Sequence, residues 1–157
     1  MKGHPKALAA LKSLLKYQLT TINQSFLHAR MCLDWGYEGL ARHIRKDSIA
    51  NMVFAEELID RILFLESMPS LRDTYKMAIG QDVAKIHDND LKLAKQTVAC
   101  ANDAVATCTT ANDDTSRELA ESILLKEEDR VDWLESQLKI IHDTGLGLYL
   151  SQQLRKG

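Results

Sequence analysis

The feature that most constrains this chain lies near its N-terminus. There a stripe of residues spaced three and four apart predicts one face of a long α-helix. A second stripe of Leu19, Asn23 and Phe26 lies beside it. This helix therefore has two contact faces, which predicts burial both in a helical bundle and in a subunit interface. The members of the first stripe, in chain order, are Leu8, Leu11, Leu15, Gln18, Ile22, Ser25, Ala29 and Leu33.

Similar stripes follow along the rest of the chain, and few residues interrupt them. The 157 residues include only two prolines and seven glycines, and this scarcity of helix breakers predicts an all-α protein. We expect one domain, residues 1–157, with helices at about 5–34, 40–65, 82–110, 115–143 and 146–154. The expected boundary signals are Pro5, Gly36, Gly39, Pro69, Asp82, Asn112-Asp113-Asp114 and Gly145.

Charge and cysteine content exclude several classes of function. A formal net charge of -2 provides no basic field for nucleic acid. No apolar run reaches the length of about 18 residues that a membrane span needs, and the N-terminus does not resemble a signal peptide. Cys32, Cys100 and Cys108 lack the spacing of a zinc site or a disulfide framework. We therefore expect a cytoplasmic protein with reduced cysteines and neither a nucleic-acid nor a membrane partner.

The inward-facing stripes carry unusual residues about half-way along four predicted helices. Helical di-iron carboxylate proteins fill such a layer with one Glu from each of two helices and Glu-x-x-His from the other two. Here the two pairs spaced i, i+3 read Asn51-x-x-Phe54 and Glu127-x-x-Arg130. The six positions of this layer, in chain order, are Gln18, Asn51, Phe54, Ala94, Glu127 and Arg130.

Several segments resemble bacterioferritin, and together they span nearly the whole chain. Residues 23–31 (NQSFLHARM) resemble its first helix, and residues 61–69 (RILFLESMP) resemble the end of its second helix. Asp132-Trp133-Leu134-Glu135 and Gly145-Leu146 resemble its fourth and fifth helices. The resemblance implies a ferritin-like four-helix bundle, with a long crossover between the second and third helices plus a short fifth helix. It also implies a cage of about 24 chains that stores iron as mineral and binds haem at two-fold dimer interfaces.

The resemblance places the family's ferroxidase ligands at the six positions of the polar layer. Only Glu127 keeps the family's residue, and Ser25 stands where the family often has a redox-active Tyr. Arg130 replaces a His and cannot coordinate iron, because a guanidinium does not deprotonate. We therefore expect a degenerate ferroxidase centre, in which Arg130 pairs with Glu127 while Gln18 and Asn51 hydrogen-bond around them.

The outward face of the second helix carries Met52, which on its own would be an ordinary packing residue. In bacterioferritins, a methionine at this position binds haem iron axially, one from each subunit of a dimer. A haem with two Met ligands has no open position, so it transfers electrons and does not activate oxygen. Val53 departs from the family, which often has a lysine there. The other expected haem-pocket residues are Leu19, Ile22, Asn23, Phe26, Arg45 and Ile49.

These residues predict a division of labour within one cage. This chain would bind haem b and pass electrons to the stored ferric mineral for iron release, while a ferroxidase-competent ferritin-like subunit would oxidise Fe(II). A bacterioferritin-associated ferredoxin would supply the electrons. Two alternatives stay open: an ordinary ferroxidase with iron displaced around Glu127, and a purely structural shell subunit. The sequence therefore does not decide whether the chain alone is an enzyme.

Overall fold

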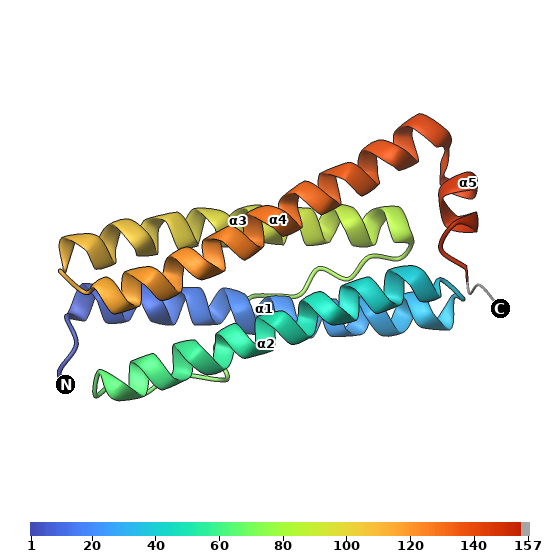
Figure 1. Ribbon diagram of the computed structural model, residues 1–157. Helices are drawn as coiled ribbons and strands as arrows, with labels where there is room; N and C mark the ends of the chain where they lie inside the picture. Colours follow the sequence, from blue (N-terminus) through green and yellow to red (C-terminus); the bar gives the residue numbers. More distant parts are fainter. Residues whose placement is uncertain (155–157) are drawn as a thin grey trace.

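The computed structural model describes residues 1–154, which form five helices and no strand (Figure 1). The helices are α1 (Pro5–Asp34), α2 (Glu38–Phe64), α3 (Val83–Thr110), α4 (Asp114–Thr144) and α5 (Leu146–Ser151). The first four lie lengthwise as a bundle, and the short α5 lies across the end where α4 finishes. The expected all-α bundle with a short fifth helix is therefore confirmed. None of these helices combines the length and the apolar character needed to cross a membrane.

The connection between α2 and α3 runs along the bundle from one end to the other (Figure 1). It occupies residues 65–82 and contains turns, bends and irregular chain but neither helix nor strand. Because the chain crosses the bundle before α3 begins, α2 and α3 run in the same direction. The most extensive helix contacts are those between α1 and α2 and between α3 and α4. The predicted long crossover is thus present.

Local signals explain most of the helix boundaries. Asp82 accepts a hydrogen bond from Lys85 N at 2.8 Å, and Asp113 accepts one from Ser116 N at 3.1 Å, as N-cap residues do. Gly145, with φ +87°, separates α4 from α5. These three signals act as the sequence predicted.

Two boundary predictions were wrong at the contact between α2 and the C-terminal segment. Gly39 does not follow the first helix but lies in the first turn of α2. The fifth helix ends at Ser151 rather than at residue 154. The two segments meet there, since Gly39 N donates to Gln153 O at 3.0 Å.

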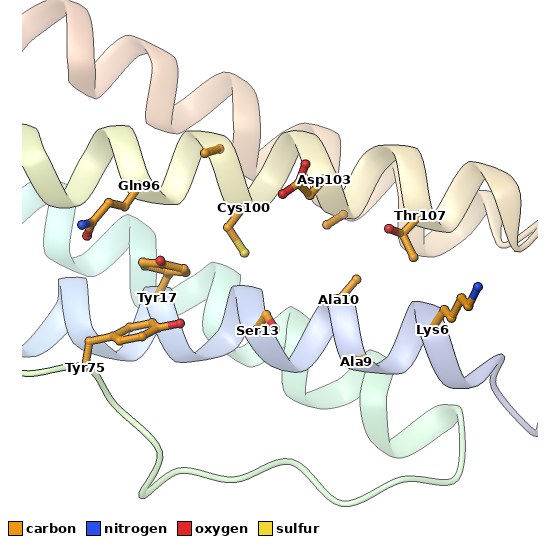
Figure 2. A pocket seen from close by; sticks show the side chains of 12 residues that line it. Lys6, Ala9, Ala10, Ser13, Tyr17, Tyr75, Gln96, Cys100, Asp103 and Thr107 are labelled. Carbon is orange, nitrogen blue, oxygen red and sulfur yellow. The ribbon is translucent and has the colours of Figure 1, made fainter.

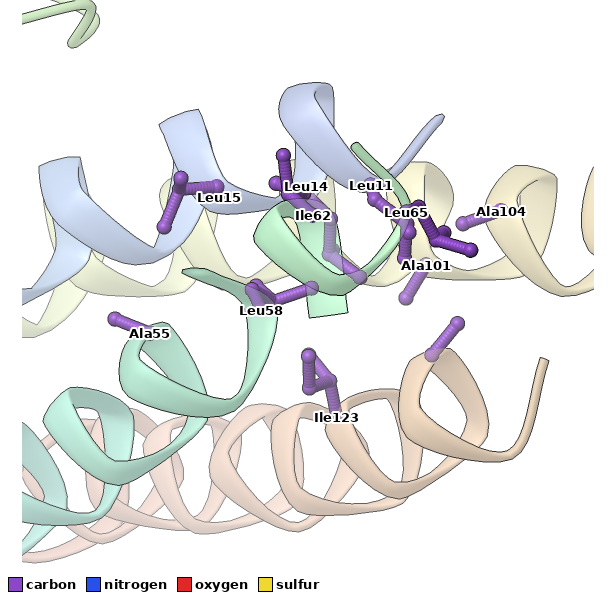
Figure 3. Packing of buried hydrophobic residues seen from close by; sticks show 11 residues of the cluster. Leu11, Leu14, Leu15, Ala55, Leu58, Ile62, Leu65, Ala101, Ala104 and Ile123 are labelled. Atoms are coloured by element: carbon purple, nitrogen blue, oxygen red, sulfur yellow. The ribbon is translucent and has the colours of Figure 1, made fainter. Parts of the chain in front are cut away.

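The apolar core has two separate parts, one toward each end of the bundle. The larger part includes Leu11, Leu15, Leu58, Ile62 and Ile123, which converge from α1, α2 and α4 (Figure 3). The smaller part gathers around Cys32, Ile44, Ile86 and Tyr149 near the other end. The residues between these clusters along each helix include most of the buried polar side chains. The fold therefore places a polar layer across the middle of the bundle.

The first predicted stripe follows this core with one exception. Leu33 was expected to face inward, but 43% of its surface is exposed. Its neighbour Cys32 is fully buried in the smaller apolar cluster instead. The inward face of α1 has therefore moved by one residue at its C-terminal end.

Candidate functional site

The structure brings the six predicted layer positions into or near the interior. Gln18, Asn51, Ala94 and Glu127 are at most 1% exposed, and Arg130 is 6% exposed. The sixth, Phe54, is only half-buried and packs against the larger apolar cluster. The polar side chains that the six predicted positions place in the interior are therefore two amides, one carboxyl group and one guanidinium.

Arg130 lies between two acidic side chains and bonds directly to neither. Its Nη2 donates to Ser25 Oγ at 2.9 Å and lies 4.0 Å from Asp90 Oδ2. Its Nη1 lies 3.9 Å from Glu127 Oε2. Ser25 is thus the direct hydrogen-bond partner of Arg130. The expected pairing with Glu127 occurs only as a long electrostatic contact.

The expectation that the layer is satisfied by its own hydrogen bonds was wrong. Seven buried atoms of the layer have no hydrogen-bond partner in the protein: Gln18 Nε2 and Oε1, Thr21 Oγ1, Asn51 Nδ2, Glu127 Oε1 and Oε2, and Arg130 Nη1. Each unmet buried group costs about 1–3 kcal/mol, and a whole domain is stable by only about 5–15 kcal/mol. Left without any partner, these atoms would destabilise the folded state by about as much as the whole free energy of unfolding of a domain.

Burial has opposite outcomes for the two carboxyl groups beside Arg130. Burial raises the pKa of Glu127 above its ordinary value, and the Arg130 charge and the nearby Gln18 offset only part of this. Burial also favours a raised pKa at Asp90, but the hydrogen bond from His28 and the charge of Arg130 hold it below its usual value. Asp90 is therefore the carboxylate that balances Arg130 most firmly.

Sequence reasoning missed the part of the layer around Asp90. Asp90 Oδ1 accepts hydrogen bonds from Gln24 Nε2 at 2.8 Å and from His28 Nδ1 at 2.9 Å. All three side chains are at most 2% exposed. Asp90 lies four residues before Ala94, so it occupies the same helical stripe. That spacing was the available signal, but a charged residue within an apolar pattern reads first as a surface residue.

A row of polar side chains on α1 also holds the crossover in place. The residues are spaced four apart, which puts them on one face of the helix. Each accepts a hydrogen bond from a backbone N–H of the crossover, so the buried face of α1 is polar where it meets this segment. The pairs are Tyr75 N to Thr20 Oγ1 at 2.9 Å, Ala78 N to Gln24 Oε1 at 2.9 Å, and Gly80 N to His28 Nε2 at 3.1 Å.

On the opposite side of the layer, Asp47 links α2 to α4. Asp47 Oδ1 lies 3.3 Å from Lys126 Nζ, and its Oδ2 lies 3.5 Å from His43 Nε2. Burial favours a raised pKa at Asp47, but the hydrogen bond from His43 and the charges of Lys126 and Arg130 lower it overall. The layer therefore carries compensating charges on both sides of Glu127.

The expected haem residues lie on a shared surface of α1 and α2. Phe26 is 57% exposed, and Ile49 and Met52 are each 50% exposed. The two helices are joined at this level by a hydrogen bond from Ser48 Oγ to Ile22 O at 3.3 Å. Exposed apolar side chains and a thioether thus lie on the outer surface of two adjacent helices. Of the other expected pocket residues, Leu19 and Ile22 are half-buried, whereas Asn23 and Arg45 are exposed.

A groove of about 620 Å³ lies elsewhere, between α1 and α3 (Figure 2). Tyr17 and Tyr75 form one end of it, with ring centroids 4.5 Å apart, and Lys6 lies toward the other end. Several of its other lining residues are small, and Cys100 lies near its middle. No residue of the predicted layer or of the haem face lines this groove, so it is separate from the candidate site.

Comparisons with known proteins agree with the fold and with the residue patterns. The model of the ferritin-like domain matches residues 8–143. A bacterioferritin from Mycobacterium avium is 36% identical over 152 residues, covering 97% of this chain and 96% of its own length. A bacterial ferritin from Synechocystis is 39% identical over 155 residues, covering 98% and 99%. At this identity and coverage, the chain belongs to the bacterioferritin family of iron-storage proteins.

Proposed function

We propose that this chain is a haem-binding bacterioferritin subunit that has lost its own di-iron ferroxidase centre. The observation that carries the proposal is the buried layer, where Gln18, Asn51 and Ala94 accompany Glu127 and Arg130. A pair of ferrous ions needs several anionic oxygen ligands together with imidazoles. The six predicted positions offer one carboxyl group with a raised pKa and a permanent cation beside it. In addition, no three His, Cys, Asp or Glu side chains converge as metal ligands within residues 1–154.

The open face of α1 and α2 supports the haem-binding part of the proposal. Met52 offers a thioether, a soft neutral ligand suited to haem iron. Phe26 and Ile49 offer exposed apolar surface against which a macrocycle can pack. Arg45, also exposed, offers a cation for a propionate. These residues fit haem b, with a second Met52 supplied by another copy of the chain across a two-fold axis.

The role of this subunit would be the release of iron rather than its oxidation. Bound haem would supply one-electron transfer toward the ferric mineral, and the axial ligand would help to set its potential. Met52 would hold the haem, while the apolar face would exclude water from it. A ferredoxin of the kind that serves bacterioferritins would deliver the electrons, in the cytoplasm.

A subunit without a ferroxidase centre needs a source of oxidised iron. We propose that it shares a cage of about 24 chains with a ferritin-like subunit whose four carboxylates are intact. Mass spectrometry of the cage purified from its native source tests this part. A second, carboxylate-complete ferritin chain in the same particle is the expected result, and a native particle built of this chain alone would contradict it.

Haem binding is tested by the Met52→Leu variant. We expect wild-type protein to show a strong haem Soret band and the variant to lose it, because leucine fills the same volume without a sulfur ligand. Absorbance spectra after reconstitution with haem give the measurement. Met68→Leu is the matched control, since Met68 is 76% exposed on the crossover and belongs to no predicted site. Equal bands in wild type and Met52→Leu would remove the electron-transfer role and leave the structural alternative.

A further inference from the structure

We infer that the degenerate layer is a binding site for ordered water, held among Gln18, Asn51, Glu127 and Arg130. Side chains of three helices, α1, α2 and α4, supply its unpartnered atoms, and every one of these side chains is at least nine-tenths buried. Such a concentration of unmet polar groups at one level of a bundle requires a ligand that can reach all of them. The inference concerns the same layer as the proposed loss of the ferroxidase centre, but it does not depend on haem.

The kind of ligand follows from the balance of donors and acceptors. Three of the unpartnered atoms are nitrogen donors, from Gln18, Asn51 and Arg130. Three others are oxygen acceptors, one from Gln18 and two from Glu127. The seventh, the hydroxyl of Thr21, can serve either way. Water both donates and accepts, so a few molecules can meet both groups at once.

Ions of either sign fit the layer less well than water. A cation would meet the Arg130 guanidinium, which keeps its charge at any physiological pH. An anion would meet the carboxyl groups of Glu127 and Asp90, which lie 3.9 Å and 4.0 Å from Arg130. Bound water avoids both conflicts, since it carries no net charge.

The long contacts of Arg130 point to the same ligand. Its nitrogens lie 3.9 Å from Glu127 Oε2 and 4.0 Å from Asp90 Oδ2. Both distances are too long for a hydrogen bond, and polar groups separated in this way are commonly bridged by water. The two sides of Arg130 differ, because Asp90 has direct partners in Gln24 and His28 whereas Glu127 has none. The water therefore belongs on the Glu127 side.

Atomic-resolution crystal structures of the intact assembly test the inference, with one crystal soaked in Fe(II) and measured at the iron absorption edge. We expect ordered water within hydrogen-bond distance of Gln18, Asn51 and Glu127, and no iron signal in the layer. A dry layer whose side chains have turned to pair with one another would overturn the inference. Anomalous density from iron at Glu127 would overturn both this inference and the proposed loss of the ferroxidase centre. Loss of haem binding would affect neither.

A matched pair of variants tests which residues hold the water. Gln18→Leu removes a donor and an acceptor from the site, so the water bonded to them should be absent from its density. Thr97→Val is the control, because Thr97 is equally buried but its hydroxyl donates to Leu93 O in its own helix. It should leave the water unchanged. Unaltered solvent density in Gln18→Leu would contradict the assignment of the site.

Discussion

At the scale of single residues, the proposed loss of the ferroxidase centre depends most on Arg130. A histidine at this position could bind a metal, but the guanidinium is a permanent charge that the interior has to balance. Asp90 and Glu127 lie 4.0 Å and 3.9 Å away on either side, and Ser25 accepts the one direct hydrogen bond. The small Ser25 side chain brings its hydroxyl within hydrogen-bond distance of the guanidinium.

Arg130→Ala should destabilise the protein by about 3–5 kcal/mol, since removing one member of a buried charge group leaves the others uncompensated. Thermal or denaturant unfolding measures the effect. Arg117→Ala is the matched control on the same helix, because its contacts with Asp114 and Glu121 are near the surface. That change should cost much less stability, because exposed ion pairs are screened by solvent. Equal losses in the two variants would show that Arg130 has no special role.

Glu127→Gln should change how stability depends on pH. The folded pKa of Glu127 lies above its ordinary value of 4.5, because burial favours the protonated form. Below the pKa that Glu127 has in the unfolded chain, its favourable contribution to the free energy of unfolding is fully present. The wild type loses this contribution as the pH rises through the pKa that Glu127 has in the folded protein. The variant should therefore gain stability relative to wild type with rising pH, by about 1.4 kcal/mol for each unit of elevation.

Melting temperatures of both proteins from acidic to neutral pH provide the measurement for Glu127→Gln. Glu135→Gln serves as the control, because the Glu135 side chain is 52% exposed and its difference from wild type should stay nearly constant. A relative stability of Glu127→Gln that falls with rising pH would contradict the raised pKa.

At the scale of helices, the sequence was informative wherever the determinants were local. The caps Asp82 and Asp113 and the stop at Gly145 act through neighbouring residues, so their roles could be predicted. The inward phase of Gln18 and Glu127 followed from spacing, as did that of Arg130. These signals gave the five helices and the level of the layer.

What could not be predicted depends on residues far apart in the sequence. His28 is completely buried and bonds to Asp90, 62 positions later. In the sequence, the row of Thr, Gln and His on α1 resembles a solvent-exposed face. Only the structure shows that the crossover covers it. The direct partner of Arg130 was missed for the same reason, since Ser25 is 105 positions away.

The hydrogen bonds between α1 and the crossover lead to a further prediction. His28→Phe removes the acceptor for Gly80 N and a donor to Asp90, so the crossover should open more often. We expect trypsin to cut at the exposed Arg72 and Lys76 about tenfold faster, which corresponds to about 1.4 kcal/mol in the opening equilibrium. Mass spectrometry of timed digests measures this. His142→Phe changes a side chain that is 88% exposed, so it should not change the rate of tryptic cleavage. If His28→Phe also leaves that rate unchanged, the hydrogen bonds to His28 do not hold the crossover in place.

At the scale of the whole molecule, the proposed function assigns different tasks to the interior and to the outer face of the bundle. Two apolar clusters stabilise its ends, and the polar layer lies between them. Met52 lies on the outer face, where half of its surface is exposed. Such a chain would contribute shell surface and a route for electrons, and it would depend on another subunit for iron oxidation.

Stopped-flow measurement of Fe(II) oxidation by cages assembled from this chain alone tests whether its ferroxidase centre is lost. If the ferroxidase centre is lost, wild-type cages should oxidise Fe(II) no faster than buffer does, and Glu127→Ala should leave the trace unchanged. A rapid phase of oxidation in the wild type that disappears in Glu127→Ala would contradict the account and identify the chain as an ordinary ferroxidase.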